Sequence, residues 1–205
     1  MDELKATSTQ PVDAAPPLVL ARRILLRSQG TFFVLLAICI GIDHGSAART
    51  DGISFYGVYH RTVVLLVLGF GAAAAGLWRA AAHFVHSDAP LLVCRVMRLV
   101  AVGLFALLVT PFNRGPLLNW THMSVGVAIA LLQLSVGLSL VRRLPSPRSI
   151  AILAVLLFGG AMAAASLPDW NFPYLLQGEV VYQLGFSWCL IEWTRVLYGR
   201  RASLA

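Results

Sequence analysis

Ionisable and amide side chains inside otherwise apolar stretches are the residues with which this protein could bind a ligand or react. Glu179, Tyr182 and Gln183 are spaced at i, i+3 and i+4, so a helix would present them on one face. His122 and Gln133 are eleven residues apart. That spacing is about three helical turns, or ~16 Å of rise, which puts both on one stripe. Because an unpartnered polar group is costly in apolar surroundings, both stripes are expected to face the protein interior.

These stripes predict an outward-facing polar pocket in which His122 and Glu179 face each other or share a ligand. The candidate binding residues are Arg61, Arg114, His122, Glu179 and Tyr182. One interpretation is structural: His122 bonds a neighbouring carbonyl or carboxylate, and Glu179 pairs with Arg61 or Arg114. A second is a site for a ligand, a lipid headgroup or a substrate. A metal site is the third, although His122 and Glu179 belong to separate segments and form no HExxH-like pair.

Six apolar segments must position these residues, and each is close to the ~20 residues that a helix needs to cross a bilayer. They cover residues 25–42, 62–82, 91–110, 121–141, 150–167 and 175–194. A mean hydropathy of +0.76 and 58% apolar residues leave too little polar surface for a soluble chain of 205 residues. We therefore predict an all-α fold, a polytopic membrane protein with a bundle of six transmembrane helices.

Basic residues mark one side of these segments. If the N-terminus is cytoplasmic, thirteen of the sixteen Lys and Arg residues lie inside, and only Arg49, Arg61 and Arg114 lie outside. Cytoplasmic loops are enriched in Lys and Arg, so the pattern predicts N-in and C-in. The net charge of +7 is then explained by basic residues that face the anionic inner leaflet and orient the protein in the membrane. Nucleic acid is therefore not an expected partner. Fifteen arginines against one lysine indicate a GC-rich genome, so we expect a multi-pass protein of a bacterial inner membrane.

The sequence predicts that the chain is divided into two tails and one transmembrane domain. Residues 1–24 are predicted to be a flexible cytoplasmic tail, because polar residues and prolines mix there without periodicity. Residues 25–197 are predicted to form the six-helix transmembrane domain. Residues 198–205 are predicted to form a short cytoplasmic tail.

Glu192 lies in the last segment near its inner boundary. An unpaired carboxylate is costly at that depth, and three guanidinium groups are within plausible reach. Arg195 is one helical turn further along, just past the end of that segment, while Arg95 and Arg98 share a face of the third segment. We predict that Glu192 is paired with one of these three arginines.

Several short motifs resemble those of a known group. They are Ile53-Ser54 followed by Gly57, His122 at the start of the fourth segment, and Glu179 with Gly185-Phe186-Ser187-Trp188 on the sixth. In these motifs, over residues 30 to 195, the chain resembles an uncharacterised family of bacterial six-helix membrane proteins distantly similar to the damage-regulated autophagy modulators. The resemblance implies six helices and no established chemistry. It transfers no autophagy or lipid-organising role to any residue here.

Three kinds of function fit these observations. Noncatalytic binding of membrane lipids, or of another membrane protein, is favoured because the polar residues gather at the rims of the segments. A small transporter or channel would need a continuous polar path across the bundle. A membrane-embedded lipid hydrolase would use His122 and Glu179 as base or metal ligands. No cofactor is expected, since the chain has no Gly-rich phosphate loop, and only His122 lies plausibly inside a segment whereas a haem held by two histidines at each face needs pairs on two helices.

Overall fold

The computed structural model describes residues 17–85, 89–166 and 172–202. Within these ranges all regular structure is helical. The helices are α1 (Pro17–Ile42), α2 (Ser46–Asp51), α3 (Phe55–Val58), α4 (Val63–Val85), α5 (Leu91–Val109), α6 (Pro116–Arg143), α7 (Pro147–Ala165) and α8 (Leu175–Ala202). The prediction of an all-α fold is confirmed.

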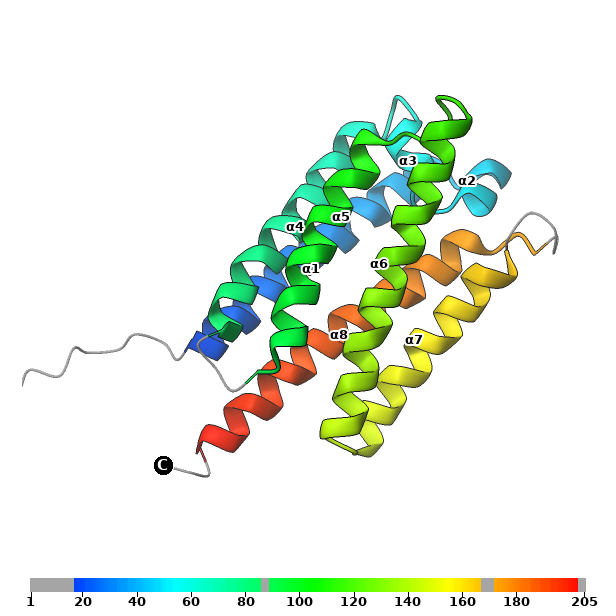
Figure 1. Cartoon of the computed structure of the whole chain (residues 1–205). Coiled ribbons are helices and arrows are strands. Elements are labelled where there is room, and N and C mark those ends of the chain that lie inside the picture. The colour runs from blue at the N-terminus through cyan, green and yellow to red at the C-terminus, as the bar shows by residue number, and fades with distance from the viewer. Residues whose placement is uncertain (1–16, 86–88, 167–171, 203–205) are drawn as a thin grey trace, which may run out of the picture.

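The six long helices form an elongated bundle with two different ends (Figure 1). At one end, the cap end, lie α2, α3 and the turn that joins α5 to α6. At the other, the terminal end, α1 begins and α8 finishes, α4 ends and α5 begins, and the connection from α6 to α7 lies there too. Each long helix therefore runs between these two ends, antiparallel to the next long helix in the chain.

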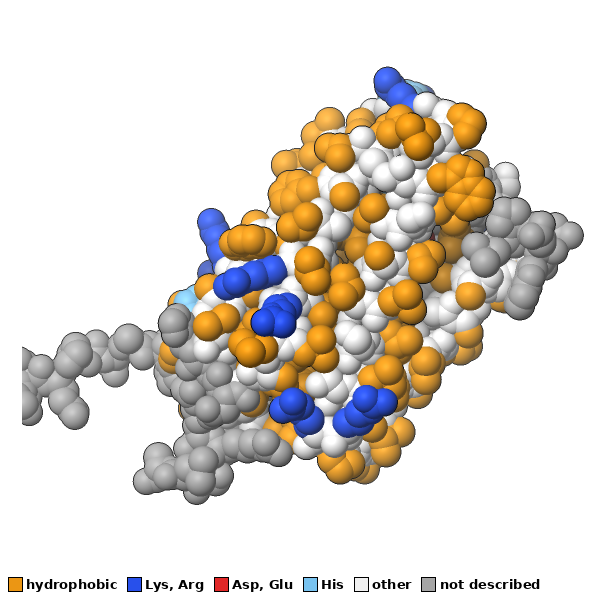
Figure 2. Space-filling model, viewed as in Figure 1, with side chains coloured by type: hydrophobic (Ala, Val, Ile, Leu, Met, Phe, Trp, Pro, Cys, Tyr) orange, Lys and Arg blue, Asp and Glu red, His pale blue; other side chains and the backbone are white. Residues whose placement is uncertain are grey.

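In the described part of the chain, five helices are long and apolar enough to cross a membrane, namely α1, α4, α5, α6 and α7. On the face seen in Figure 2, hydrophobic side chains cover most of the length of the bundle. Arginine side chains gather toward the terminal end of that face, and one further group lies at the cap end. A soluble bundle would hide its apolar side chains, so this surface defines the protein as an all-α membrane bundle.

Helix α8 is 28 residues long and does not belong to these five. It carries Glu179, Gln183, Glu192 and Arg195, which lower its mean hydropathy. The side chains that it buries include Phe186, Cys189, Leu190 and Trp193. Its polar residues are thus part of a helix that packs largely against protein, and such a helix needs fewer apolar residues than one exposed to lipid.

Two expected boundaries differ from the structure. Helix α1 begins at Pro17, so residues 17–24, predicted as flexible tail, are helical. Proline is well tolerated in a first helical turn, and Leu18 and Ala21 pack into the core, which is why the helix extends this far. Residues 198–202, predicted as a C-terminal tail, continue α8. Residues 1–16 and 203–205 of the predicted tails lie outside the described ranges.

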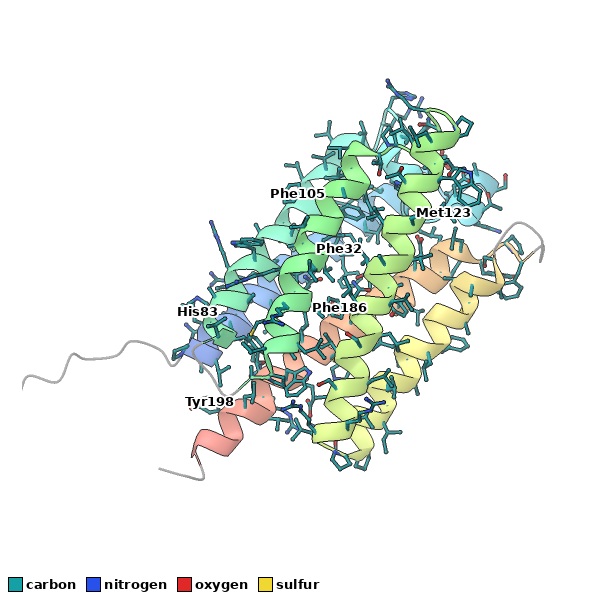
Figure 3. All side chains as sticks on the ribbon, viewed as in Figure 1. Phe32, His83, Phe105, Met123, Phe186 and Tyr198 are labelled. Atoms are coloured by element: carbon teal, nitrogen blue, oxygen red, sulfur yellow. The ribbon has the colours of Figure 1, made fainter. Side chains whose placement is uncertain are left out.

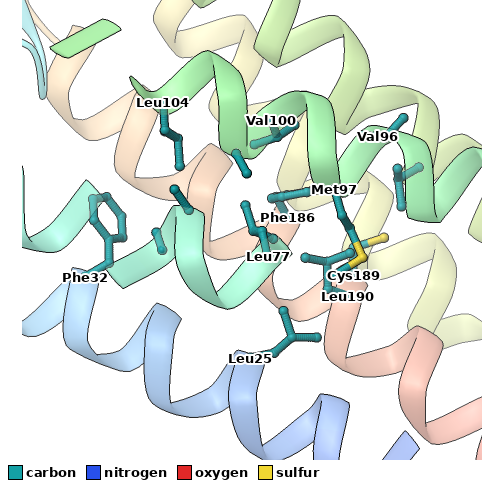
Figure 4. Packing of buried hydrophobic residues seen from close by; sticks show 14 of the residues in the cluster. Leu25, Phe32, Leu77, Val96, Met97, Val100, Leu104, Phe186, Cys189 and Leu190 are labelled. Carbon is teal, nitrogen blue, oxygen red and sulfur yellow. The ribbon is translucent and has the colours of Figure 1, made fainter. Parts of the chain in front are cut away.

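The core lies between α1, α4, α5 and α8. Figure 4 shows Leu25, Leu77, Met97 and Phe186 meeting from these four helices, and all four are almost fully buried. Helix α8 also approaches α7 very closely. A Cβ atom built on Gly159 would lie 2.5 Å from the backbone nitrogen of Tyr182, so only glycine permits this crossing.

Candidate functional site

Residues 43–61 fold over the cap end, and we call this segment the cap. Tyr56 anchors it: the side chain is fully buried, and its hydroxyl donates to the Asp43 carbonyl oxygen at 2.8 Å. Burial, with a smaller effect from Asp43, raises the pKa of Tyr56 to about 12, so the phenol keeps its proton and remains a donor. Thr62, the residue before α4, donates its hydroxyl to the Tyr56 carbonyl oxygen at 3.0 Å. The first of these hydrogen bonds lies within the cap, and the second connects the cap to the residue that precedes α4.

Glu179 on α8 holds the centre of the cap. Its Oε2 atom accepts a hydrogen bond from the backbone N–H of Ile53 at 2.6 Å. The preceding residue, Gly52, has φ +70° and ψ −157°, a conformation that essentially only glycine adopts. A Cβ atom on Gly52 would overlap the Glu179 carboxylate and lie 2.9 Å from its Cδ. Gly52 thus gives the carboxylate room to reach the backbone.

His122 on α6 holds the next residue of the cap. Its Nε2 atom lies 2.7 Å from the Ser54 hydroxyl oxygen, and its Nδ1 atom lies 2.7 Å from the Thr110 carbonyl oxygen. A carbonyl can only accept, so Nδ1 carries the proton. In the neutral ring, Nε2 then accepts the hydrogen bond that Ser54 donates. His122 therefore ties the cap to both α6 and the end of α5.

A small cavity lies beside this contact. Its volume is ≈ 20 Å³, and it is lined by the cap, α4, α5, α6 and the turn between α5 and α6. Ser54 and His122 provide polar groups, while Leu66, Phe70 and Phe112 are among its apolar walls. A cavity of this size holds about one water molecule. A lipid headgroup does not fit into it while the cap is in this position.

The structure brings His122 and Glu179 to the same place by way of the cap. They hydrogen bond to Ser54 and Ile53, whose Cα atoms are about 3.8 Å apart as in any trans peptide unit. The sequence predicted that the two side chains face each other or a shared ligand. What they share is this two-residue stretch of the chain itself. His122 bonds a neighbouring carbonyl, as the structural interpretation expected.

Arg61 and Arg114 are exposed at the cap end. Among the residues that the structure describes, the one ion pair joins Glu192 and Arg195, so neither arginine pairs with Glu179. No three His, Cys, Asp or Glu side chains of the described ranges lie close enough together to hold a metal ion.

Tyr182 lies deeper than expected for the edge of a pocket. Its hydroxyl donates to the Ala130 carbonyl oxygen at 2.5 Å and so links α8 to α6. One residue further on, the Gln183 and Gln133 amides bond each other, with N···O distances of 3.1 and 3.4 Å. The two predicted stripes therefore do face one another inside the bundle.

The row of polar contacts along α8 continues toward the terminal end. Ser187 donates to the Oε1 atom of Gln29 on α1 at 3.1 Å, while the Nε2 atom of Gln29 is buried without a partner. Glu192 is 4% exposed, and its two carboxylate oxygens accept from Arg195 at 2.9 and 2.5 Å. The predicted pairing of Glu192 is confirmed, and Arg195 is the partner.

Sequence reasoning missed Gly52, Ser54 and Gln29 as members of these contacts. The dipeptide Asp51-Gly52 is a turn signal that marks the point where the cap bends. Nothing comparable marks Gln29, because a lone glutamine in an apolar run does not reveal its partner.

A helical membrane bundle with a folded cap at one end is the class that the fold and these contacts define. No family model, no curated protein and no solved structure matches the chain.

Proposed function

We propose that the protein is a noncatalytic, multi-pass protein of a bacterial inner membrane, with six spans and both termini in the cytoplasm. Helix α8 is the sixth span. Its length of 28 residues is more than the ~20 that a crossing needs, and it runs beside α7 along the bundle (Figure 1). It ends at the same end of the bundle where α1 begins, as an even number of crossings requires. The thirteen-to-three distribution of basic residues supports the orientation.

Cysteine labelling tests this topology. Asn113→Cys and Asp51→Cys lie at the cap end and should react with an impermeant maleimide in intact cells. Ser146→Cys, in the connection between α6 and α7, should react only after permeabilisation. The three native cysteines are buried and give a low background. Labelling of Ser146→Cys in intact cells would contradict the N-in orientation.

The role that the geometry supports best is binding of an anionic group at the cap end, from a membrane lipid or a partner protein. The observation that carries it is the placement of Arg61 and Arg114. Both are exposed, and they follow closely after Val58 and Phe112, which line the same cavity. Neither guanidinium group pairs with a carboxylate of the part of the chain that the structure describes, so both are suited to bind a phosphate or a carboxylate.

In this proposal the five candidate residues have different tasks. Arg61 and Arg114 contact the ligand. His122 and Glu179 position the cap by holding Ser54 and Ile53, while Tyr182 fixes α8 to α6.

Binding is tested on the full chain in nanodiscs. For the lipid source, Arg61→Gln with Arg114→Gln should reduce the co-purification of phosphatidylglycerol relative to phosphatidylcholine. For the protein source, a photoreactive residue at Asn113 should crosslink to the partner protein in native membranes. The double substitution Arg61→Gln with Arg114→Gln should abolish these crosslinks. Arg49→Gln, on α2, removes an exposed arginine from the same end and is the matched control. If neither readout separates the double variant from the control, binding by these two arginines is rejected.

A membrane-embedded lipid hydrolase is the second candidate, and the contact between Ser54 and His122 favours it. A hydroxyl that donates to a histidine, whose other nitrogen is oriented by a carbonyl, is the arrangement of an activated nucleophile. The cap would have to move to admit a substrate. A fluorophosphonate probe should then label the wild type and fail to label Ser54→Ala. An unlabelled wild type in native membranes would dismiss the candidate.

A further inference from the structure

A groove opens on the side of the bundle between α4 and α5. Its volume is ≈ 300 Å³, at the lower end of the range found for ligand sites, which is roughly 300 to 1,000 Å³. Alanines form the floor, and Trp78, Val102 and Phe105 form exposed walls. Figure 3 labels Phe105 on the outer surface of α5. The lining is almost wholly apolar, so this groove is suited to a hydrocarbon chain.

One end of the groove is basic. Arg79 is part of the lining, and the Arg98 guanidinium carbon lies 5.7 Å from the centre of the Trp78 ring. Both arginines are exposed, and neither has an ion pair with any residue of the described ranges. Figure 2 shows arginine side chains gathered over this end of the bundle. Two guanidinium groups that form no ion pair within residues 17–85, 89–166 and 172–202 lie at the mouth of this apolar groove, so the matching ligand carries an anion at one end.

The order of residues along the groove matches the polarity of a lipid. Arg79 is six residues from the end of α4, and Arg98 is seven residues from the start of α5. At 1.5 Å per residue, both lie roughly 10 Å from the terminal end of the bundle, where a long side chain can extend to headgroup level. Phe105 lies about two turns further along α5, toward the middle of the bilayer.

We propose that this groove binds an anionic phospholipid from the leaflet at the terminal end of the bundle. Arg79 and Arg98 bind its phosphate, and one acyl chain lies on the alanine floor between Trp78 and Phe105. A zwitterionic lipid is a poorer ligand, because its own ammonium group already neutralises the phosphate. The site is separate from the cap, so the proposal does not depend on the function assigned to the cap end.

Tryptophan quenching by brominated lipids tests it on the full chain in vesicles. Phosphatidylglycerol with brominated acyl chains should quench Trp78 at lower mole fractions than brominated phosphatidylcholine. The Trp78→Phe variant identifies the part of the signal that comes from the groove. Arg79→Gln and Arg98→Gln should each lower the preference for phosphatidylglycerol about fivefold, which corresponds to ~1 kcal/mol per basic residue at an anionic surface.

Arg142→Gln with Arg143→Gln is the matched control, because it removes two exposed arginines at the same end, on α6 and outside the groove. This control variant should leave the preference of the groove for phosphatidylglycerol over phosphatidylcholine unchanged. Ala75→Phe fills the groove without a change of charge and should also weaken quenching of Trp78 by phosphatidylglycerol. Equal quenching by both lipids in the wild type would overturn the proposal. So would a control variant that loses as much preference as the groove variants.

Discussion

Replacing Gly52 by alanine is expected to loosen the cap, because two separate costs act at this position. The backbone conformation is one that essentially only glycine adopts, and a non-glycine residue there costs about 1–3 kcal/mol. The new Cβ would also overlap the Glu179 carboxylate. Glu179 would have to move and lose its hydrogen bond to the Ile53 N–H, and a bond to a charged group contributes about 1.5–3 kcal/mol.

Together these costs predict a destabilisation of about 2.5–6 kcal/mol for Gly52→Ala. For a chain of this size, each kcal/mol lowers the Tm by roughly 2–4 °C. The measurement is thermal unfolding of the purified protein in a mild detergent, followed by the loss of its monodisperse peak in size-exclusion chromatography.

Gly115 provides a matched control. It also has a positive φ, +117°, but a Cβ atom there would meet no other atom within 4 Å. Gly115→Ala should therefore show the backbone cost alone. In a Glu179→Ala background, Gly52→Ala should likewise keep only its backbone cost. Equal Tm losses for Gly52→Ala in both backgrounds, or equal losses at Gly52 and Gly115, would refute the role assigned to Glu179.

Three further predictions concern the contacts within the bundle. Glu192→Gln should lower the Tm, and Arg195→Gln should add little to it, because the two side chains form one pair. Gln133→Leu and Gln183→Leu should each cost ~1 kcal/mol, and the double variant should cost less than their sum, because it leaves no amide without its partner. Gly159→Ala should separate α7 from α8 and lower the Tm strongly, because its Cβ would meet backbone atoms. Each is checked by the same thermal assay.

The controls for these variants come from equivalent positions. Arg95→Gln should be additive with Glu192→Gln, since Glu192 pairs with Arg195. Gly126→Ala should leave the Tm nearly unchanged, because a Cβ there meets nothing within 4 Å. A strong loss at Gly126, or full additivity of Glu192→Gln with Arg195→Gln, would contradict the contacts described above.

The sequence by itself determined the class of protein and the existence of two different ends. Hydropathy and charge add up along the chain whatever the fold, so the apolar segments and the excess of arginine at one side were readable without coordinates. The pairing of Glu192 with Arg195 could also be predicted from the sequence, because two residues that are three positions apart on a helix lie on the same face. A stripe such as Glu179 with Gln183 predicts a buried face for the same reason.

Only the tertiary structure decided what those faces meet. His122 and Glu179 come from different helices, and the cap residues Ile53 and Ser54 between them belong to a third segment, so their contacts depend on helix rotation and on the path of a loop. The early start of α1 likewise depends on the packing of Leu18 against the rest of the bundle. The groove between α4 and α5 is formed where alanines of both helices lie between Trp78 and Phe105. This arrangement depends on how the two helices pack, so neither segment predicts it alone.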